Sequence, residues 1–98
     1  MKKKFAFLLM GNEYDPPRHQ ACFETEKGIS YLCAVRNPEE AKTRALELVR
    51  DGVGAIELCG AFGQELAREL IAITENKVAV GYVVHDPEQD ELFSRFFS

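Results

Sequence analysis

The stretch from Gly52 to Gly63, GVGAIELCGAFG, decides how the rest of the chain is read. Its apolar run from Val53 to Leu58 is bounded by glycines, and a run of this length and bounding predicts a strand buried on both faces. Glu57 is the exception, because it puts a carboxylate where such a strand normally carries an apolar residue. The two-residue period of a strand places Glu57 on one face with Val53, Ala55 and Cys59.

The residues after this strand, Gly60, Ala61, Phe62 and Gly63, predict a short turn ahead of a helix. Two glycines permit positive φ angles and close approach of the backbone, and a helix N-terminus presents free N–H groups to an anion. Two interpretations stay open: a loop that binds an anion, and a tight turn that binds nothing. Neither GxGxxG nor GxxxxGK[ST] occurs, and we expect no cofactor.

The rest of the chain alternates between strand and helix patterns. Strands are predicted over Phe5 to Met10, Ile29 to Val35, Val53 to Leu58 and Val78 to Val84, with Cys22 to Thr25 as a candidate for a short edge strand. Helical crossovers between successive strands imply parallel neighbours. The expected fold is therefore α/β: a small, mostly parallel four-strand sheet with a βαβαβ core, in one domain over residues 1–98.

Capping signals mark where the helices begin and end. Asn37, Pro38 and Glu40 form an N-cap, a first-position proline and an N3 glutamate, and Gly52 suits the end of the same helix. A second long helix is expected to run to about Glu75. Asp86 and the proline after it begin a short terminal helix, whose large apolar residues are Leu92, Phe93, Phe96 and Phe97.

Composition excludes several classes of protein. The net charge of −4 gives no nucleic-acid footprint. The basic run from Lys2 to Lys4 precedes a strand that is too short for a membrane span or for most signal segments, so we expect a cytoplasmic protein. Three cysteines, an odd number without CxxC spacing, predict reduced thiols rather than a disulfide framework.

Three stretches together resemble a family of small bacterial proteins that is known only as a domain of unknown function. They are IELCGAFG from Ile56 to Gly63, DPPRH from Asp15 to His19, and NPEEA before the first long helix. Relatives often carry glycine where this chain has Ala61. The resemblance covers nearly the whole chain, and it implies a compact α/β domain without implying any activity.

A candidate site is expected at the carboxyl ends of the strands, where open parallel sheets bind ligands. The predicted catalytic residues are Glu57, Cys59 and His85, and the predicted ligand-binding residues are Gly11, Arg18, His19, Arg36, Gly60, Ala61, Phe62 and Gly63. A carboxylate in a buried strand must be paired, so we expect Glu57 to contact Arg36, His85 or another polar group at this rim. Each residue also has a structural interpretation, such as an ion pair, a packed thiol or a backbone hydrogen bond.

A metal is chemically conceivable but not predicted. His19, Cys22, Cys59 and His85 are the residue types that bind zinc, yet their spacing does not require a site.

Three functions remain as hypotheses. The first is a small oligomeric domain that binds a small anionic molecule at the rim. The second is a lyase or isomerase with Glu57 as base and Cys59 or His85 as its partner, which is an analogy of fold. The third is a structural subunit that docks a partner through its terminal helix. Because a small sheet leaves edges and a face exposed, we expect a homodimer or higher oligomer in which part of the terminal helix covers its own sheet and Phe96 or Phe97 meets the second copy.

Overall fold

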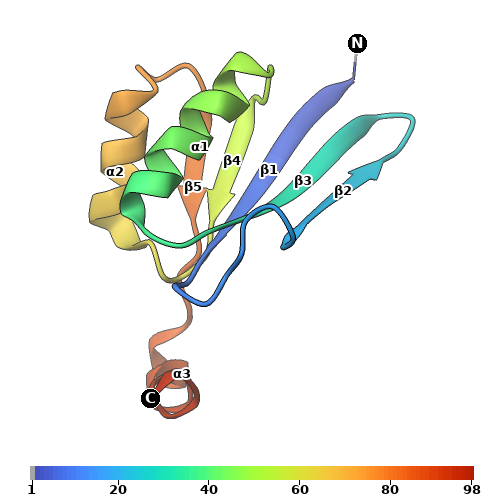
Figure 1. Cartoon of the computed structure of the whole chain (residues 1–98). Helices are drawn as coiled ribbons and strands as arrows, with labels where there is room; N and C mark the ends of the chain where they lie inside the picture. Colours follow the sequence, from blue (N-terminus) through green and yellow to red (C-terminus); the bar gives the residue numbers. More distant parts are fainter. Residues whose placement is uncertain (1) are drawn as a thin grey trace.

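The chain forms one sheet with a layer of two helices against it, and a third helix stands apart (Figure 1). The computed structural model describes residues 2–98. The elements are β1 (Lys3–Met10), β2 (Gln20–Glu24), β3 (Gly28–Val35), α1 (Pro38–Arg50), β4 (Ala55–Leu58), α2 (Gly63–Ile73), β5 (Ala79–Tyr82), the 3-10 helix η1 (Pro87–Gln89) and α3 (Asp90–Phe97). The α/β class, the βαβαβ core and the short terminal helix are confirmed.

The sheet has five strands in the order β2-β3-β1-β4-β5. The strand β1 lies at the centre and is parallel to both β3 and β4, while β5 is parallel to β4. The edge strand β2 is antiparallel to β3, so the predicted count of four strands was one too low. All residues of β2 are exposed, and the strand therefore lacks the alternation of buried and exposed residues on which a sequence pattern depends.

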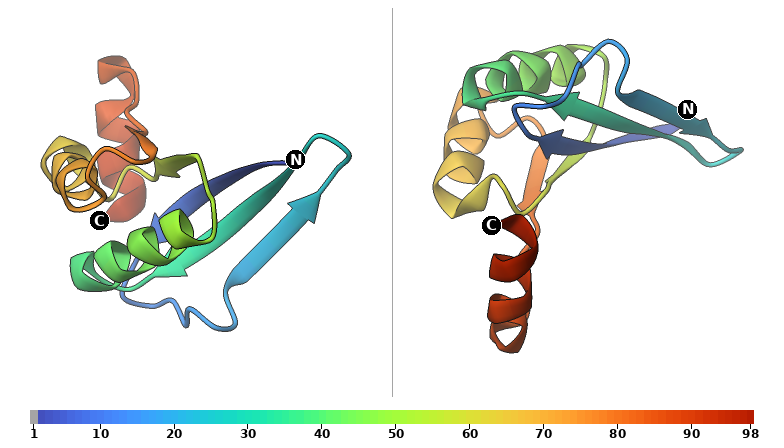
Figure 2. Two further views of the ribbon diagram at one scale, coloured as in Figure 1. Left: turned by 90° about the horizontal axis from the view of Figure 1, so that it is seen from above. Right: turned by 60° about the horizontal axis from the view of Figure 1, so that its bottom comes forward.

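Both long helices lie on the same face of the sheet, as Figure 2 shows. The crossovers from β3 through α1 to β4, and from β4 through α2 to β5, step across the sheet in one direction. Right-handed crossovers in one direction put their helices on one side. Beneath the helices the core contains residues with 0–2% exposure, among them Leu8, Ile56, Leu58 and Leu70.

The opposite face of the sheet carries no helix, and we call it the open face. Residues aligned across the strands define it: Phe5, Phe7 and Leu9 of β1, Ser30, Leu32 and Ala34 of β3, Ala55 and Glu57 of β4, and Ala79 and Gly81 of β5. Ser30 and Ala79 are exposed, Ala34 is buried and the others are half-buried, whereas Ala6 and Leu8 on the other face of β1 are fully buried. The prediction that residues 53–58 form a strand buried on both faces is therefore wrong, because the helices cover one side only.

The helix ends follow the predicted signals. Asn37 caps α1 by accepting a hydrogen bond from the backbone N–H of Glu40 at 2.9 Å. Gly52 follows the helix with a φ of 91°, which glycine adopts without strain. At the end of α2, Glu75 and Asn76 take left-handed conformations.

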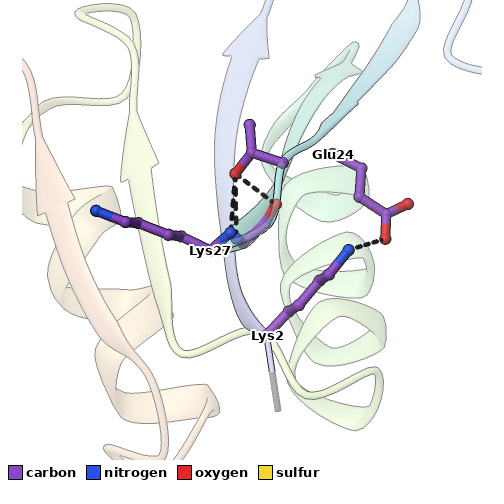
Figure 3. Close-up of polar contacts among 5 residues, drawn as sticks. Lys2, Glu24 and Lys27 are labelled. Atoms are coloured by element: carbon purple, nitrogen blue, oxygen red, sulfur yellow. Dashed lines mark hydrogen bonds and ion pairs between the residues drawn. The ribbon is translucent and has the colours of Figure 1, made fainter.

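The β2–β3 turn and the start of the chain are joined by polar contacts (Figure 3). Thr25 Oγ1 accepts hydrogen bonds from the backbone N–H groups of Lys27 and Gly28. Lys2 Nζ lies 2.6 Å from Glu24 Oε2, and this ion pair lowers the pKa of Glu24. A Cβ at Gly28 would lie 2.7 Å from the Lys3 carbonyl oxygen, so glycine is required there.

The terminal helix α3 lies beyond the carboxyl ends of the strands (Figures 1 and 2). His85 holds it there, because its ring stacks on Phe93 with centroids 4.1 Å apart and its Nε2 lies 2.6 Å from Asp90 Oδ1. The prediction that part of this helix covers its own sheet is therefore wrong: a local contact turns the helix away. Within residues 2–98, no helix is long and apolar enough to cross a membrane.

Candidate functional site

A cleft of about 540 Å³ lies at the carboxyl end of β3. The loop from Asp15 to Pro17 forms one wall, and α1 forms the other. Cys33 and Val35 contribute to its lining from β3. The cleft therefore occupies the expected end of the strands, on the side of the sheet that carries the helices.

The loop wall is held in shape by its own hydrogen bonds. The carbonyl oxygen of Asp15 accepts from the N–H groups of Arg18 at 3.0 Å and His19 at 2.9 Å. The backbone N–H of Asp15 in turn donates to His19 Nδ1 at 2.8 Å. His19 therefore fixes the loop, while the Asp15 carboxylate stays exposed at the cleft.

The first arginine of the cleft, Arg36, is bound to Glu40. Its Nε and Nη2 both donate to Glu40 Oε2, and its backbone N–H donates to Glu40 Oε1 at 2.8 Å. These hydrogen bonds raise the pKa of Arg36 and lower the pKa of Glu40. The positive charge of Arg36 thus already has a carboxylate partner.

The second arginine, Arg44, bridges α1 and β3. Its Nη1 donates to Glu47 Oε1 at 3.1 Å, and its Nη2 lies 3.6 Å from the sulfur of the buried Cys33. Cys33 is a free cysteine and is buried. Arg44 therefore anchors the helix to the sheet at the floor of the cleft.

The ionised groups of the cleft have an acidic surplus. Four carboxylates, those of Asp15, Glu39, Glu40 and Glu47, face two guanidinium groups, those of Arg36 and Arg44, which gives a net charge of −2. Glu39 lies 3.8 Å from Lys42, and Glu40 and Glu47 hold the arginines. Within residues 2–98, the Asp15 carboxylate forms no ion pair, and its charge contributes to the raised pKa of Arg36 from a longer distance.

The three predicted catalytic residues are not joined to one another by any hydrogen bond in the described part of the chain. Glu57 lies over Gly81 on the open face, and Cys59 Sγ accepts a hydrogen bond from the Met10 N–H at 3.4 Å. His85 is bound to Asp90. The expected contact of Glu57 with Arg36, His85 or another polar group at the rim is absent among residues 2–98. Glu57 lies within the strand on an uncovered face, and Arg36 and His85 have other partners.

The predicted ligand-binding residues are spread over the rim. Gly11 continues the pairing of β1 by donating to the Val35 carbonyl oxygen, and Arg18 is exposed. In the turn before α2, Phe62 is buried in the core and Gly63 has a φ of 74°. In the part of the chain that the structure describes, no side chain caps the N-terminus of α2. Only Arg36 of the predicted set lines the cleft.

The candidate metal ligands do not come together either. Across the residues that the structure describes, no three His, Cys, Asp or Glu side chains come together as metal ligands. His19, Cys22, Cys59 and His85 therefore do not converge.

Sequence reasoning missed most of the cleft. Glu40, Arg44 and Glu47 recur at helical spacing along α1, and this pattern indicates one polar face of that helix. The spacing could have grouped the residues of α1, but only the fold brings the loop beside them.

These features define a small α/β domain with a one-sided sheet and an acidic cleft at the end of β3. The chain belongs to a family of unknown function, DUF6506, whose sequence pattern matches residues 3–98. No curated protein and no solved structure matches the chain.

Proposed function

We propose that this domain binds a small molecule carrying a protonated amine in the cleft at the carboxyl end of β3. The observation that supports this proposal is the Asp15 carboxylate, which lines the cleft and forms no ion pair among residues 2–98. A charged group that remains unpaired in a cleft is suited to bind a ligand of opposite charge.

The charge of the cleft favours an amine over the anion expected from the sequence. An anion would have to displace Glu40 from Arg36 or Glu47 from Arg44, since each guanidinium already holds a carboxylate. The net charge of −2 in the cleft would also repel an anion. An amine requires no such exchange, because it can pair with Asp15 directly.

Three ligands of equal chain length test this proposal by thermal unfolding. They are 1,4-diaminobutane, butane-1,4-diol and succinate, which are respectively cationic, neutral and anionic. Binding to the native state alone raises its stability by about 2.7 kcal/mol at a hundredfold excess over Kd. For a domain of 98 residues, that corresponds to a rise in Tm on the order of 10 °C. Sodium chloride at matched ionic strength controls for screening.

Two variants locate the binding. Asp15→Asn keeps the backbone contacts of the loop and removes the carboxylate charge, so it should abolish the rise with diaminobutane. Glu88→Gln removes one carboxylate from η1, outside the cleft, and should retain the rise. A rise with succinate alone, or an equal rise in the Asp15→Asn variant, would overturn the amine proposal.

The enzyme hypothesis gains no support from this geometry, because the structure does not bring its three residues together. Glu57 lies over Gly81, Cys59 accepts a hydrogen bond from the Met10 N–H, and His85 is bound to Asp90. The hypothesis of a structural subunit depends on a different surface, that of the terminal helix α3.

A further inference from the structure

Two apolar surfaces of this chain have no partner within residues 2–98. One is the open face of the sheet, which carries phenylalanine and leucine side chains along β1 and β3. The other is a stripe on α3, formed by Leu92, Phe93, Phe96 and Phe97. Contiguous apolar surfaces that reach solvent often mark interaction sites.

The stripe is strongly exposed. Leu92 is 56% exposed, Phe96 is 80% exposed and Phe97 is 74% exposed. Positions separated by one, three and four residues fall on one side of a helix, so these side chains point together. Ser94 and Ser98 lie on the opposite side. The helix is therefore amphipathic, and its apolar side remains largely exposed.

We propose that the occupant of the open face is α3 of a second copy of this chain. Each copy would place its α3 stripe on the open face of the other, so that two identical contacts close a symmetric dimer. Every chain carries both surfaces. Because both are apolar, the stripe of one copy and the open face of the other can bury each other.

The area of such an exchange suits a stable dimer. Phenylalanine side chains bury about 150–250 Å² each, so the exposed parts of two stripes amount to about 1,000 Å² of apolar surface. The two open faces would bury about as much again. The sum is close to the roughly 1,200–2,000 Å² of specific protein interfaces.

Charge is also complementary across this contact. Glu57 is the acidic residue in the middle of the open face, and within residues 2–98 it forms no hydrogen bond or ion pair. Arg95 borders the α3 stripe beside Leu92, and its carboxylate partner among the described residues is Glu91 at 2.9 Å. An exchanged helix can place Arg95 next to Glu57. Without such a partner, the Glu57 carboxylate would lose its hydration in the interface and gain no ion pair in return.

The contact of His85 with α3 favours a second copy over closure onto the same sheet. The ring of His85 stacks on Phe93 and its Nε2 meets Asp90, which directs the helix away from the strands. Exchange leaves the cleft accessible, because the cleft lies on the side of the sheet that carries the helices. The two proposals therefore stand independently.

Light scattering of the full chain tests the exchange. We expect twice the monomer mass of 11.1 kDa, and we expect dissociation on dilution. The Phe96→Glu/Phe97→Glu variant puts two charges in the stripe and should be monomeric. The matched control is Ser94→Glu/Ser98→Glu, which adds the same charges to the opposite side of α3 and should remain dimeric.

A mixing experiment separates exchange from other dimers. Phe7→Glu should disrupt the open face and also give monomers, with Leu32→Glu as the substitute if Phe7→Glu fails to fold by circular dichroism. Mixed with the α3 variant, it should form a heterodimer, because one intact helix can still meet one intact open face. A dimer held by two α3 helices, or by two open faces, would not re-form in this mixture, because one of its two contacting surfaces is disrupted in either case.

Three outcomes would overturn the proposal. The first is a wild-type monomer at all concentrations, which would mean that α3 folds onto its own sheet or stays free. The second is a dimer that survives both α3 substitutions. The third is the absence of a heterodimer from the mixture of the two monomeric variants.

Discussion

Leu8 and Leu9 occupy adjacent positions of the central strand, and alanine at either position removes the same atoms from opposite faces of the sheet. Leu8 is fully buried beneath the helices, whereas Leu9 is half-buried on the open face. Because the two substitutions are chemically identical, any difference between them measures how the two faces are covered.

The expected difference is large. Leu8→Ala leaves a cavity that the packed core cannot fill, which costs about 4 kcal/mol of unfolding free energy. Leu9→Ala removes surface that is partly in water already and leaves no enclosed cavity, so we expect a loss of about 1 kcal/mol. With a urea m-value of about 1.5 kcal/mol/M, the midpoint should fall by roughly 2–3 M for Leu8→Ala and by less than about 1 M for Leu9→Ala.

Urea unfolding at two protein concentrations provides the assay. At the lower concentration the monomer predominates, and the two losses should differ as stated. At the higher concentration Leu9→Ala should cost more, because a dimer that covers the open face adds burial at that position. Equal losses for Leu8→Ala and Leu9→Ala at the lower concentration would refute the reasoning, since they would show that the monomer covers both faces.

Two further predictions concern charge. Arg36 lowers the pKa of Glu40 in the native state, so stability gained from this carboxylate is present above its ordinary pKa and is lost as pH falls through the native value. The urea midpoint of Glu40→Gln should therefore fall less on acidification than that of the wild type, and parallel curves would contradict this. For the uncapped N-terminus of α2, we expect phosphate to raise Tm above that in chloride at equal ionic strength, with the gain abolished by Gly63→Val. Equal values of Tm in the two salts would leave only a structural turn at Gly60 to Gly63.

The local signals of the sequence were sufficient for the elements themselves. Asn37, Pro38 and Glu40 predicted the start of α1, and Gly52 predicted its end. Such signals depend on residues a few positions apart, whose hydrogen bonds form within one turn. Continuous apolar runs similarly predicted β1, β3 and β4, because a central strand must be apolar on at least its core face.

The sequence pattern did not predict how these elements are arranged in space. An apolar run is consistent with a strand covered on one face or on two, and only the strand order shows that both helices share one side. Glu57 illustrates the consequence: the same carboxylate predicts a buried pair in a covered strand and a solvent-accessible group on an open face. The cleft likewise joins Asp15 to Arg36 and Arg44 across 21 and 29 positions of the chain. The sequence alone determined the helices, the central strands and the apolar stripe of α3, because these depend on neighbouring residues. Only the tertiary structure decided which surfaces remain uncovered and which charges share a cleft, because both depend on contacts between distant segments.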